Sequence, residues 1–85
     1  MSYGRVYTFT GDGNWDDPAN WSNNTIPLSM LTGNAEIVID SVLGGECILN
    51  IVQHLSSTAT LTVKSAKYFR ISGNLVINNN SMPFS

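Results

Sequence analysis

The chain has few basic residues, and this scarcity limits what it can bind. Only four Lys and Arg occur among its 85 residues, and the formal net charge is −2. Proteins that bind nucleic acid neutralise phosphates with grouped Lys and Arg side chains. The composition therefore excludes nucleic acid as a partner.

Long apolar runs are also missing. No stretch approaches the ~20 apolar residues that a transmembrane helix needs. The opening residues MSYGRVYTF lack the apolar core of a signal peptide. We therefore expect no insertion into a membrane. The chain is either cytoplasmic as it stands or a mature segment of an exported precursor, and the residues do not separate these two.

Residue types that carry catalysis or bind metals are scarce. The single Cys47 cannot form an internal disulfide, and its position in the strand-like run of residues 46–49 (ECIL) favours a buried, unreactive thiol. One histidine, His54, and one cysteine are too few for a structural zinc site. No nucleophile elbow surrounds Ser56, and the spacing of the acidic residues establishes no glycosidase pair. We predict a protein that is not an enzyme and holds no cofactor.

One acidic loop leaves an alternative to this prediction. Asp12, Asn14 and Asp16 place oxygen atoms at alternate positions, as a calcium loop does. An EF-hand also needs Gly at its sixth position and Glu at its twelfth, where this chain has Asp17 and Asn23. These side chains therefore either cap turns through local hydrogen bonds or form a looser calcium site.

Both tryptophans lie in a turn-rich segment, residues 10–27, which we call the Trp loop. Asp17 and Pro18 suit the N-cap and the first position of a single helical turn. Trp15 and Trp21 flank this turn. Because indole burial is strongly favourable, we predict that the two rings cover one end of an apolar core.

Short strands are predicted before and after the Trp loop. Residues 5–10 alternate, with Tyr7 and Phe9 on one face. Asn-Gly and Asp-Gly, the usual dipeptides of tight hairpins, are missing after residue 36. Small polar corners there favour a chain that bends and continues, as in a parallel β-solenoid. A small antiparallel β-sandwich could use the same residues. The predicted strands begin at Ile37, Cys47, Leu61, Phe69 and Leu75.

The whole pattern predicts one all-β domain over residues 1–85. Residues 1–35 are expected to form a capping strand and the Trp loop, and residues 36–85 the coils of the solenoid. An open last coil leaves backbone groups unpaired and so offers an edge for association. The inward residues of that edge are predicted to be Leu61, Val63, Phe69, Ile71, Leu75 and Ile77.

The charges are distributed unevenly along the chain. Residues 1–50 contain all six acidic residues and one arginine, whereas residues 51–85 contain the other three basic residues and no acid. This is either chance in a small sample or a sign of complementary parts. Complementary parts would attract each other within one chain or between copies.

The Trp loop and the later strands resemble a known class. Gly13-Asn14-Trp15, the segment 17–21 (DPANW) and the strands at 59–63 and 69–75 resemble the opening of bacterial secreted or surface β-solenoid proteins of the autotransporter and adhesin type. The resemblance covers about residues 6–78. It implies an N-terminal cap and the first coils of a right-handed parallel β-helix.

This resemblance also implies a role and a location. The role is structural, in adhesion or scaffolding, and the location is the cell surface or the outside of the cell. The partners it implies are further coils or copies of the chain. The cap residues it implies are Trp15, Asp17, Pro18, Asn20 and Trp21.

Two other functions use the same residues. Exposed Trp15 or Trp21, with Tyr3, Tyr7 and Tyr68, could stack on sugar rings in a carbohydrate-binding module, so that glycans would be the partner. The chain could also be a fragment of a polysaccharide-acting β-helix protein. Burial of the indoles favours the cap, and exposure favours the module.

Overall fold

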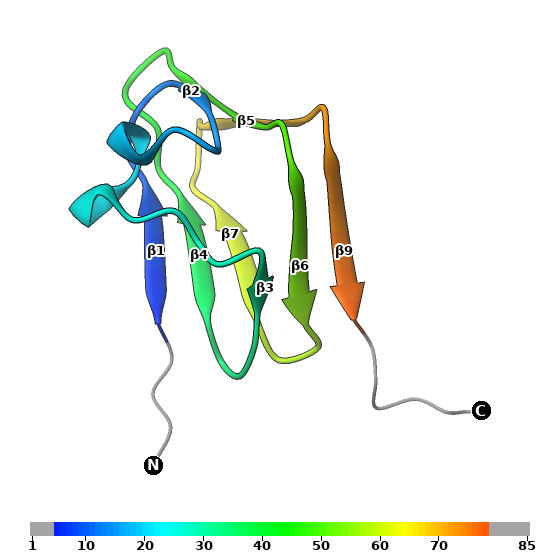
Figure 1. Cartoon of the computed structure of the whole chain (residues 1–85). Helices are drawn as coiled ribbons and strands as arrows, with labels where there is room; N and C mark the ends of the chain where they lie inside the picture. The colour runs from blue at the N-terminus through cyan, green and yellow to red at the C-terminus, as the bar shows by residue number, and fades with distance from the viewer. Residues whose placement is uncertain (1–4, 79–85) are drawn as a thin grey trace.

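The chain folds into short strands and two single-turn helices (Figure 1). The structure, a computed structural model, describes residues 5–78. The 3-10 helices are η1 (Pro18–Asn20) and η2 (Ser22–Asn24). The strands are β1 (Val6–Phe9), β2 (Gly13–Asn14), β3 (Met30–Leu31), β4 (Glu36–Ile39), β5 (Glu46–Leu49), β6 (Val52–Ser56), β7 (Thr60–Val63), β8 (Tyr68–Ile71) and β9 (Asn74–Asn78). The all-β prediction is confirmed.

These strands form three parallel sheets, with orders β1-β4-β7, β2-β5-β8 and β3-β6-β9. The chain therefore visits each sheet once and then returns to the first. We call each such pass a rung: β1–β3 form rung 1, β4–β6 rung 2 and β7–β9 rung 3. Within residues 5–78, no helix has the length and apolarity that a bilayer crossing requires.

The antiparallel β-sandwich is wrong. Every pairing between the named strands is parallel. Among the described residues, the one antiparallel contact is an isolated bridge between Phe9 and Trp21. The physical reason lies in the corners, which turn the chain into the next sheet instead of folding it back on the strand just completed.

Equivalent residues of successive rungs lie side by side. Val6 pairs with Glu36, which in turn pairs with Thr60. We call such a series of paired residues, one from each rung, a column. The longest segment between two strands, residues 15–29, belongs to rung 1 and carries both 3-10 helices. Figure 1 shows these helices beside β1, at the end of the stack away from β7 and β9.

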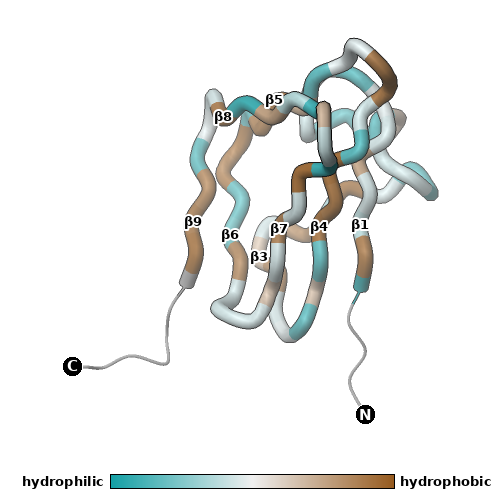
Figure 2. The backbone as a smooth tube through the Cα atoms, turned by 180° about the vertical axis from the view of Figure 1, so that it is seen from behind, coloured by the Kyte–Doolittle hydropathy of each residue, from teal (hydrophilic) through white to brown (hydrophobic). Residues whose placement is uncertain are grey.

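Alternate residues of each strand point into the space between the sheets. Tyr7 and Phe9 are buried while Val6 is exposed, as the alternation predicts. In Figure 2, hydrophobic stretches recur along the strands of successive rungs. The inward residues of rung 2 are almost completely buried: Ile37, Ile39, Cys47, Leu49, Gln53 and Leu55.

Rung 1 contains two strands that the sequence pattern did not predict. β2 and β3 have two residues each, too few to show any periodicity. They form because rung 2 supplies their partners: Trp15 N–H donates to the Ile48 carbonyl (2.7 Å), and His54 N–H donates to the Ser29 carbonyl (2.9 Å). Residues 5–35 therefore contain a complete rung, of which the Trp loop is a part.

One predicted strand is divided in the structure. One strand is predicted to begin at Cys47 and the next at Leu61, yet β5 ends at Leu49 and a second strand, β6, begins at Val52. The Asn50 side chain lies at this corner, where its Oδ1 accepts a hydrogen bond from Asp16 N–H (3.4 Å). An amide that bonds the backbone of a neighbouring rung favours a corner over a continued strand.

Candidate functional site

The helical turn of the Trp loop forms as its sequence predicts. Asp17 Oδ1 accepts a hydrogen bond from Ala19 N–H (3.1 Å). Pro18 occupies the first turn of η1, where a missing N–H has no consequence because no intrahelical partner exists there. This short turn brings Asn20 and Trp21 back toward the end of β1.

Asn20 ties the Trp loop to the first corner of the chain. Its backbone carbonyl accepts hydrogen bonds from the N–H groups of Thr10 (2.8 Å) and Gly11 (3.1 Å). Its side chain accepts from Asp12 N–H (3.2 Å) and donates to the Asn14 carbonyl (3.0 Å). The approach is so close that a Cβ at position 11 would overlap the Asn20 side chain, which explains the glycine.

Trp15, Trp21 and Phe9 form a buried aromatic cluster. The Trp21 ring meets Phe9 and Trp15 edge to face, with centroid distances of 5.2 and 4.9 Å. Trp21 Nε1 donates a hydrogen bond to the Trp15 carbonyl (2.7 Å). The Trp15 ring also lies 6.1 Å from that of Phe69 in rung 3. The cluster therefore lies in the interior, and the Trp15 ring extends it from rung 1 toward rung 3.

Burial of the indoles removes one predicted ligand platform. The exposed fractions of Trp15 and Trp21 are 0% and 2%. A ring must offer an open face to stack on a sugar, so a carbohydrate-binding surface built on these two residues is wrong. Tyr7 is also buried, and Tyr68 is exposed on the outer face of β8. Tyr3 lies outside the described residues.

The acidic part of the Trp loop hydrogen-bonds the backbone. Asp12 Oδ1 accepts from Glu46 N–H (2.9 Å), and Asp17 caps η1 through Ala19 N–H. Across residues 5–78, no three His, Cys, Asp or Glu side chains gather in a group that could hold a metal ion. The observed contacts of the two aspartates are those of residues that cap turns and corners.

Rung 3 forms the other end of the stack, and its inward residues are less covered. Val63, Ile71 and Ile77 are 40%, 47% and 63% exposed. Leu61, Phe69 and Leu75 are partly buried against the core. These six are the residues that the sequence assigned to an edge for association, and the structure places them together on rung 3.

The backbone of rung 3 alternates in the same way as its side chains. The N–H groups of Thr60, Lys64, Ser72 and Asn74 donate to rung 2 carbonyls at 2.9–3.1 Å. At the corner, Gly73 N–H also donates to the Leu49 carbonyl (2.7 Å). Parallel pairing directs the N–H and C=O of alternate residues to opposite sides of a strand. The inward residues Leu61, Val63, Phe69, Ile71, Leu75 and Ile77 therefore direct theirs away from rung 2. Among the described residues, no further strand pairs with this edge.

Two cations of rung 3 contact acids of rung 2. Lys67 Nζ lies 3.5 Å from an oxygen of Asp40 and donates a hydrogen bond to the Ser41 carbonyl (2.6 Å). Arg70 Nε lies 3.1 Å from an oxygen of Glu46. The acidic and basic parts of the sequence thus meet within one chain.

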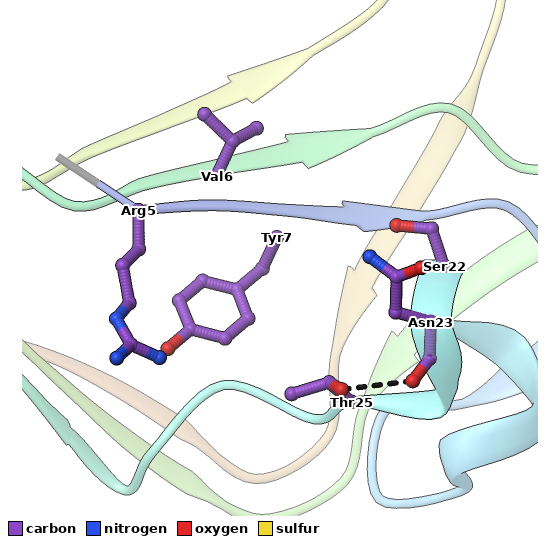
Figure 3. Close-up of a pocket in the computed structure, with 6 residues that line it drawn as sticks. All are labelled: Arg5, Val6, Tyr7, Ser22, Asn23 and Thr25. Atoms are coloured by element: carbon purple, nitrogen blue, oxygen red, sulfur yellow. Dashed lines mark hydrogen bonds between the residues drawn. The ribbon is translucent and has the colours of Figure 1, made fainter.

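A cleft lies between β1 and the segment around η2. Figure 3 shows Arg5 and Tyr7 projecting from the same side of the strand, opposite the residues of η2. The cleft encloses about 310 Å³, and a second cleft of about 290 Å³ shares Arg5 and Tyr7 with it. The sequence pattern does not reveal this cleft, because its walls come from separate segments. The residues that line it are Arg5, Val6, Tyr7, Ser22, Asn23 and Thr25.

Neither Cys47 nor His54 belongs to a catalytic arrangement in the described part of the chain. Burial, together with the nearby Glu46 carboxylate, raises the pKa of the Cys47 thiol to about 12. The thiol therefore stays protonated and unreactive near neutral pH. His54 lies in β6 between Met30 and Val76 of the neighbouring strands. Ser56 Oγ bonds the Gly33 carbonyl (3.1 Å), so it serves a corner.

Compared with protein-family models, curated proteins and solved structures, the chain matches none of them. Its function is therefore inferred from the arrangement of its own residues.

Proposed function

We propose that this chain is a structural, non-enzymatic domain that caps and nucleates a right-handed parallel β-helix. In this proposal the three rungs are the first coils of the helix, and the Trp loop is its N-terminal cap. The observation that carries the proposal is the contrast between the ends of the stack. Buried indoles close one end, whereas the other presents inward apolar residues and backbone edges in all three sheets.

The right-handed path is supported by a general property of parallel sheets. Nearly all connections between parallel strands of one sheet are right-handed. The passage from β1 through two other sheets to β4 is a connection of this kind. A three-sided right-handed coil is the path that satisfies this rule in all three sheets.

The open edge supports further coils as the partner. Unpaired strand edges attract additional strands. In repeat proteins each unit buries its inner face against the next one, and terminal units need a cap. Rung 3 has no cap comparable to the Trp loop within the described residues. A further coil would cover Val63, Ile71 and Ile77 as rung 3 covers the core of rung 2.

The resemblance to secreted and surface β-solenoid proteins supports a location outside the cell or on its surface. The role would then be to start the stack and to protect its first edge from unwanted pairing. No cofactor is needed for such a role, because burial and backbone pairing provide the stability.

Adding one coil to the chain tests this proposal. A copy of residues 36–56 is inserted after residue 81, three residues beyond β9, because three residues also separate β6 from β7. Amide hydrogen exchange is then measured at Leu61, Val63, Phe69 and Ile71. We expect exchange at these amides to slow by about tenfold or more, because the added strands accept their hydrogen bonds.

The matched control insert has the same composition with its inward and outward residues exchanged. Such an exchange moves every apolar side chain to the wrong face. It should leave the rung 3 amides as open as in the original chain. Equal exchange rates with both inserts and with no insert would contradict the proposed function.

A further inference from the structure

The open end of the stack has charge of one sign. Rung 3 carries Lys64, Lys67 and Arg70, and residues 51–85 contain no acid. Lys67 is occupied, since Asp40 and the Ser41 carbonyl both contact its ammonium group. Lys64 forms no ion pair with any described residue. Lys64 and Arg70 are therefore the cations that a partner at this end would meet.

Arg70 retains capacity for a second carboxylate. Its contacts with Glu46 use Nε and one terminal nitrogen, at 3.1 and 3.4 Å. A guanidinium has five N–H donors, so several remain. The Arg70 side chain is 57% exposed. An acidic group placed above rung 3 could bind it without displacing Glu46.

The existing columns show how such a group would be placed. Ile39 pairs with Val63 and Lys64 N–H donates to the Ile39 carbonyl, so Asp40 and Lys64 are neighbours in one column. Glu46 pairs with Tyr68, two residues before Arg70. Acids of one rung thus stand beside cations of the next, at the corner between the first and second sheets.

Two copies of this chain do not fit the open end. If two rung 3 edges met, the three cations of each copy would face one another, which costs free energy. The rung 1 end is more acidic, but its β1 edge is partly occupied. Trp21 bridges to Phe9 there, and the N–H groups of Thr10 and Gly11 already donate to Asn20.

We infer that the strand partner of rung 3 is a parallel coil with outward carboxylates, one beside Lys64 and one within reach of Arg70. This inference rests on the proposed function and adds the chemistry of the partner to it. Apolar burial and backbone hydrogen bonds hold the two coils together. The carboxylates select the partner and its register, because exposed ion pairs contribute more to specificity than to affinity.

The chain extended by one coil provides the test in three forms. The inserted copy of residues 36–56 keeps its Asp40 and Glu46 in the first form. In the second form these two positions of the copy carry Asp40→Asn and Glu46→Gln, and in the third form both are changed to Lys. Amide exchange at Leu61 and Phe69 measures how firmly the inserted coil is paired. Near-ultraviolet circular dichroism of the buried indoles checks that rung 1 is intact.

We expect exchange to be slowest with the acidic insert, about three- to tenfold faster with the neutral insert, and faster still with the lysine insert. In about 1 M NaCl the difference should disappear, since charges are then screened within ~3 Å. A Lys64→Glu substitution should reduce the difference between the acidic and lysine inserts, because Glu at position 64 attracts one inserted lysine while Arg70 still repels the other. If the side chains at these positions only filled space, Lys64→Glu would not improve the pairing of the lysine insert.

Three results would overturn the inference. Equal protection by all three inserts would show that charge does not select the partner, while the proposed function would stand. Protection by none of them would reject the proposed function together with the inference. Concentration-dependent dimers of the unextended chain that protect the same amides would show that a second copy is the partner. If an insert prevents folding, Lys64→Gln in the acidic form provides the same comparison at an exposed position.

Discussion

The two ends of this molecule use the same alternation of side chains with opposite results. Phe9, Ile39 and Val63 occupy one column, and their exposed fractions are 0%, 0% and 40%. Another inward column of the core shows the same trend, since Leu55 is 2% exposed and its partner Ile77 is 63% exposed. Burial in this fold therefore depends on what covers a rung, and only the first rung has a cover of its own among the described residues.

The largest effect is expected where that cover is removed. Trp21→Ala should destabilise the chain by about 3–5 kcal/mol, as for other buried aromatic residues replaced by alanine. A domain of this size has a stability of about 4–13 kcal/mol, so this loss would unfold a chain at the lower end of that range. Urea denaturation followed by circular dichroism measures the change.

The Trp21→Phe variant serves as the control for ring burial. It keeps an aromatic ring against Phe9 but loses the hydrogen bond from Nε1 to the Trp15 carbonyl. Its stability should lie between those of the original chain and Trp21→Ala. A loss below about 1 kcal/mol for Trp21→Ala would contradict the role of the indoles as a cover.

The same substitution made in the covered middle rung and in rung 3 sharpens the comparison. Ile39→Ala in rung 2 should cost about 2–5 kcal/mol, because it removes a fully buried side chain and leaves a cavity. Ile77→Ala in rung 3 should cost less than about 1 kcal/mol, because much of that side chain already contacts water. Denaturant midpoints of the two variants provide the measurement. Equal losses would show that rung 3 is covered in solution.

The pKa of the buried Cys47 thiol gives a second measure of how well rung 2 is shielded from water. Burial raises the pKa of Cys47 from 9.0 to about 12. Since the folded pKa lies above the unfolded value, stability from the buried neutral thiol is complete below pH 9. It is lost as the pH rises from about 9 toward 12, where the unfolded chain ionises first.

This pH dependence can be isolated with a variant that lacks the thiol. Cys47→Ala should lose the part of the alkaline destabilisation that comes from residue 47, while the ionisation of tyrosines and lysines is common to both proteins. Urea melts of both proteins are measured between about pH 8 and 11, the range in which the thiol of the unfolded chain ionises. The slopes of stability against pH are then compared. Identical slopes would mean that the thiol is accessible to water in the folded chain.

The cap of η1 should contribute a smaller amount. Asp17→Ala removes the acceptor for Ala19 N–H and should cost about 0.5–2 kcal/mol. Asp17→Asn keeps an oxygen at the same place and should cost much less, because Asn and Asp cap helices about equally well. The difference between these two variants separates capping from other effects of residue 17, and thermal melts measure it.

Much of this architecture could be predicted because it rests on local patterns. The alternation around Tyr7 and Phe9 and the Asp17-Pro18 turn need only near neighbours in sequence, and the structure confirms both. β2 and β3 could not be predicted in this way. They are strands only because residues 34 and 24 positions later pair with them, as Gly13 does with Cys47 and Met30 with His54.

Only part of the site could be predicted from the sequence. Indole burial followed from the size of the rings and from their place beside a turn. The burial of the polar residue Gln53 was not predicted. The alternation alone marks it only as an inward position. Its Nε2 donates to the Leu28 carbonyl (2.7 Å), a partner from rung 1 that sequence spacing does not reveal. The cleft beside β1 was missed for the same reason.

The smallest expected effects belong to the ion pairs that join rung 3 to rung 2. Arg70 is 57% exposed, so Arg70→Gln should cost about 0.2–1 kcal/mol in low salt and less in about 1 M NaCl. Lys67 is 22% exposed and also bonds the Ser41 carbonyl, so Lys67→Gln should cost more and depend less on salt. Urea melts at two salt concentrations compare them. If both losses disappeared equally in salt, Lys67 would act as a surface charge alone, and rung 3 would be held to rung 2 by apolar contacts and backbone hydrogen bonds without a buried polar contribution.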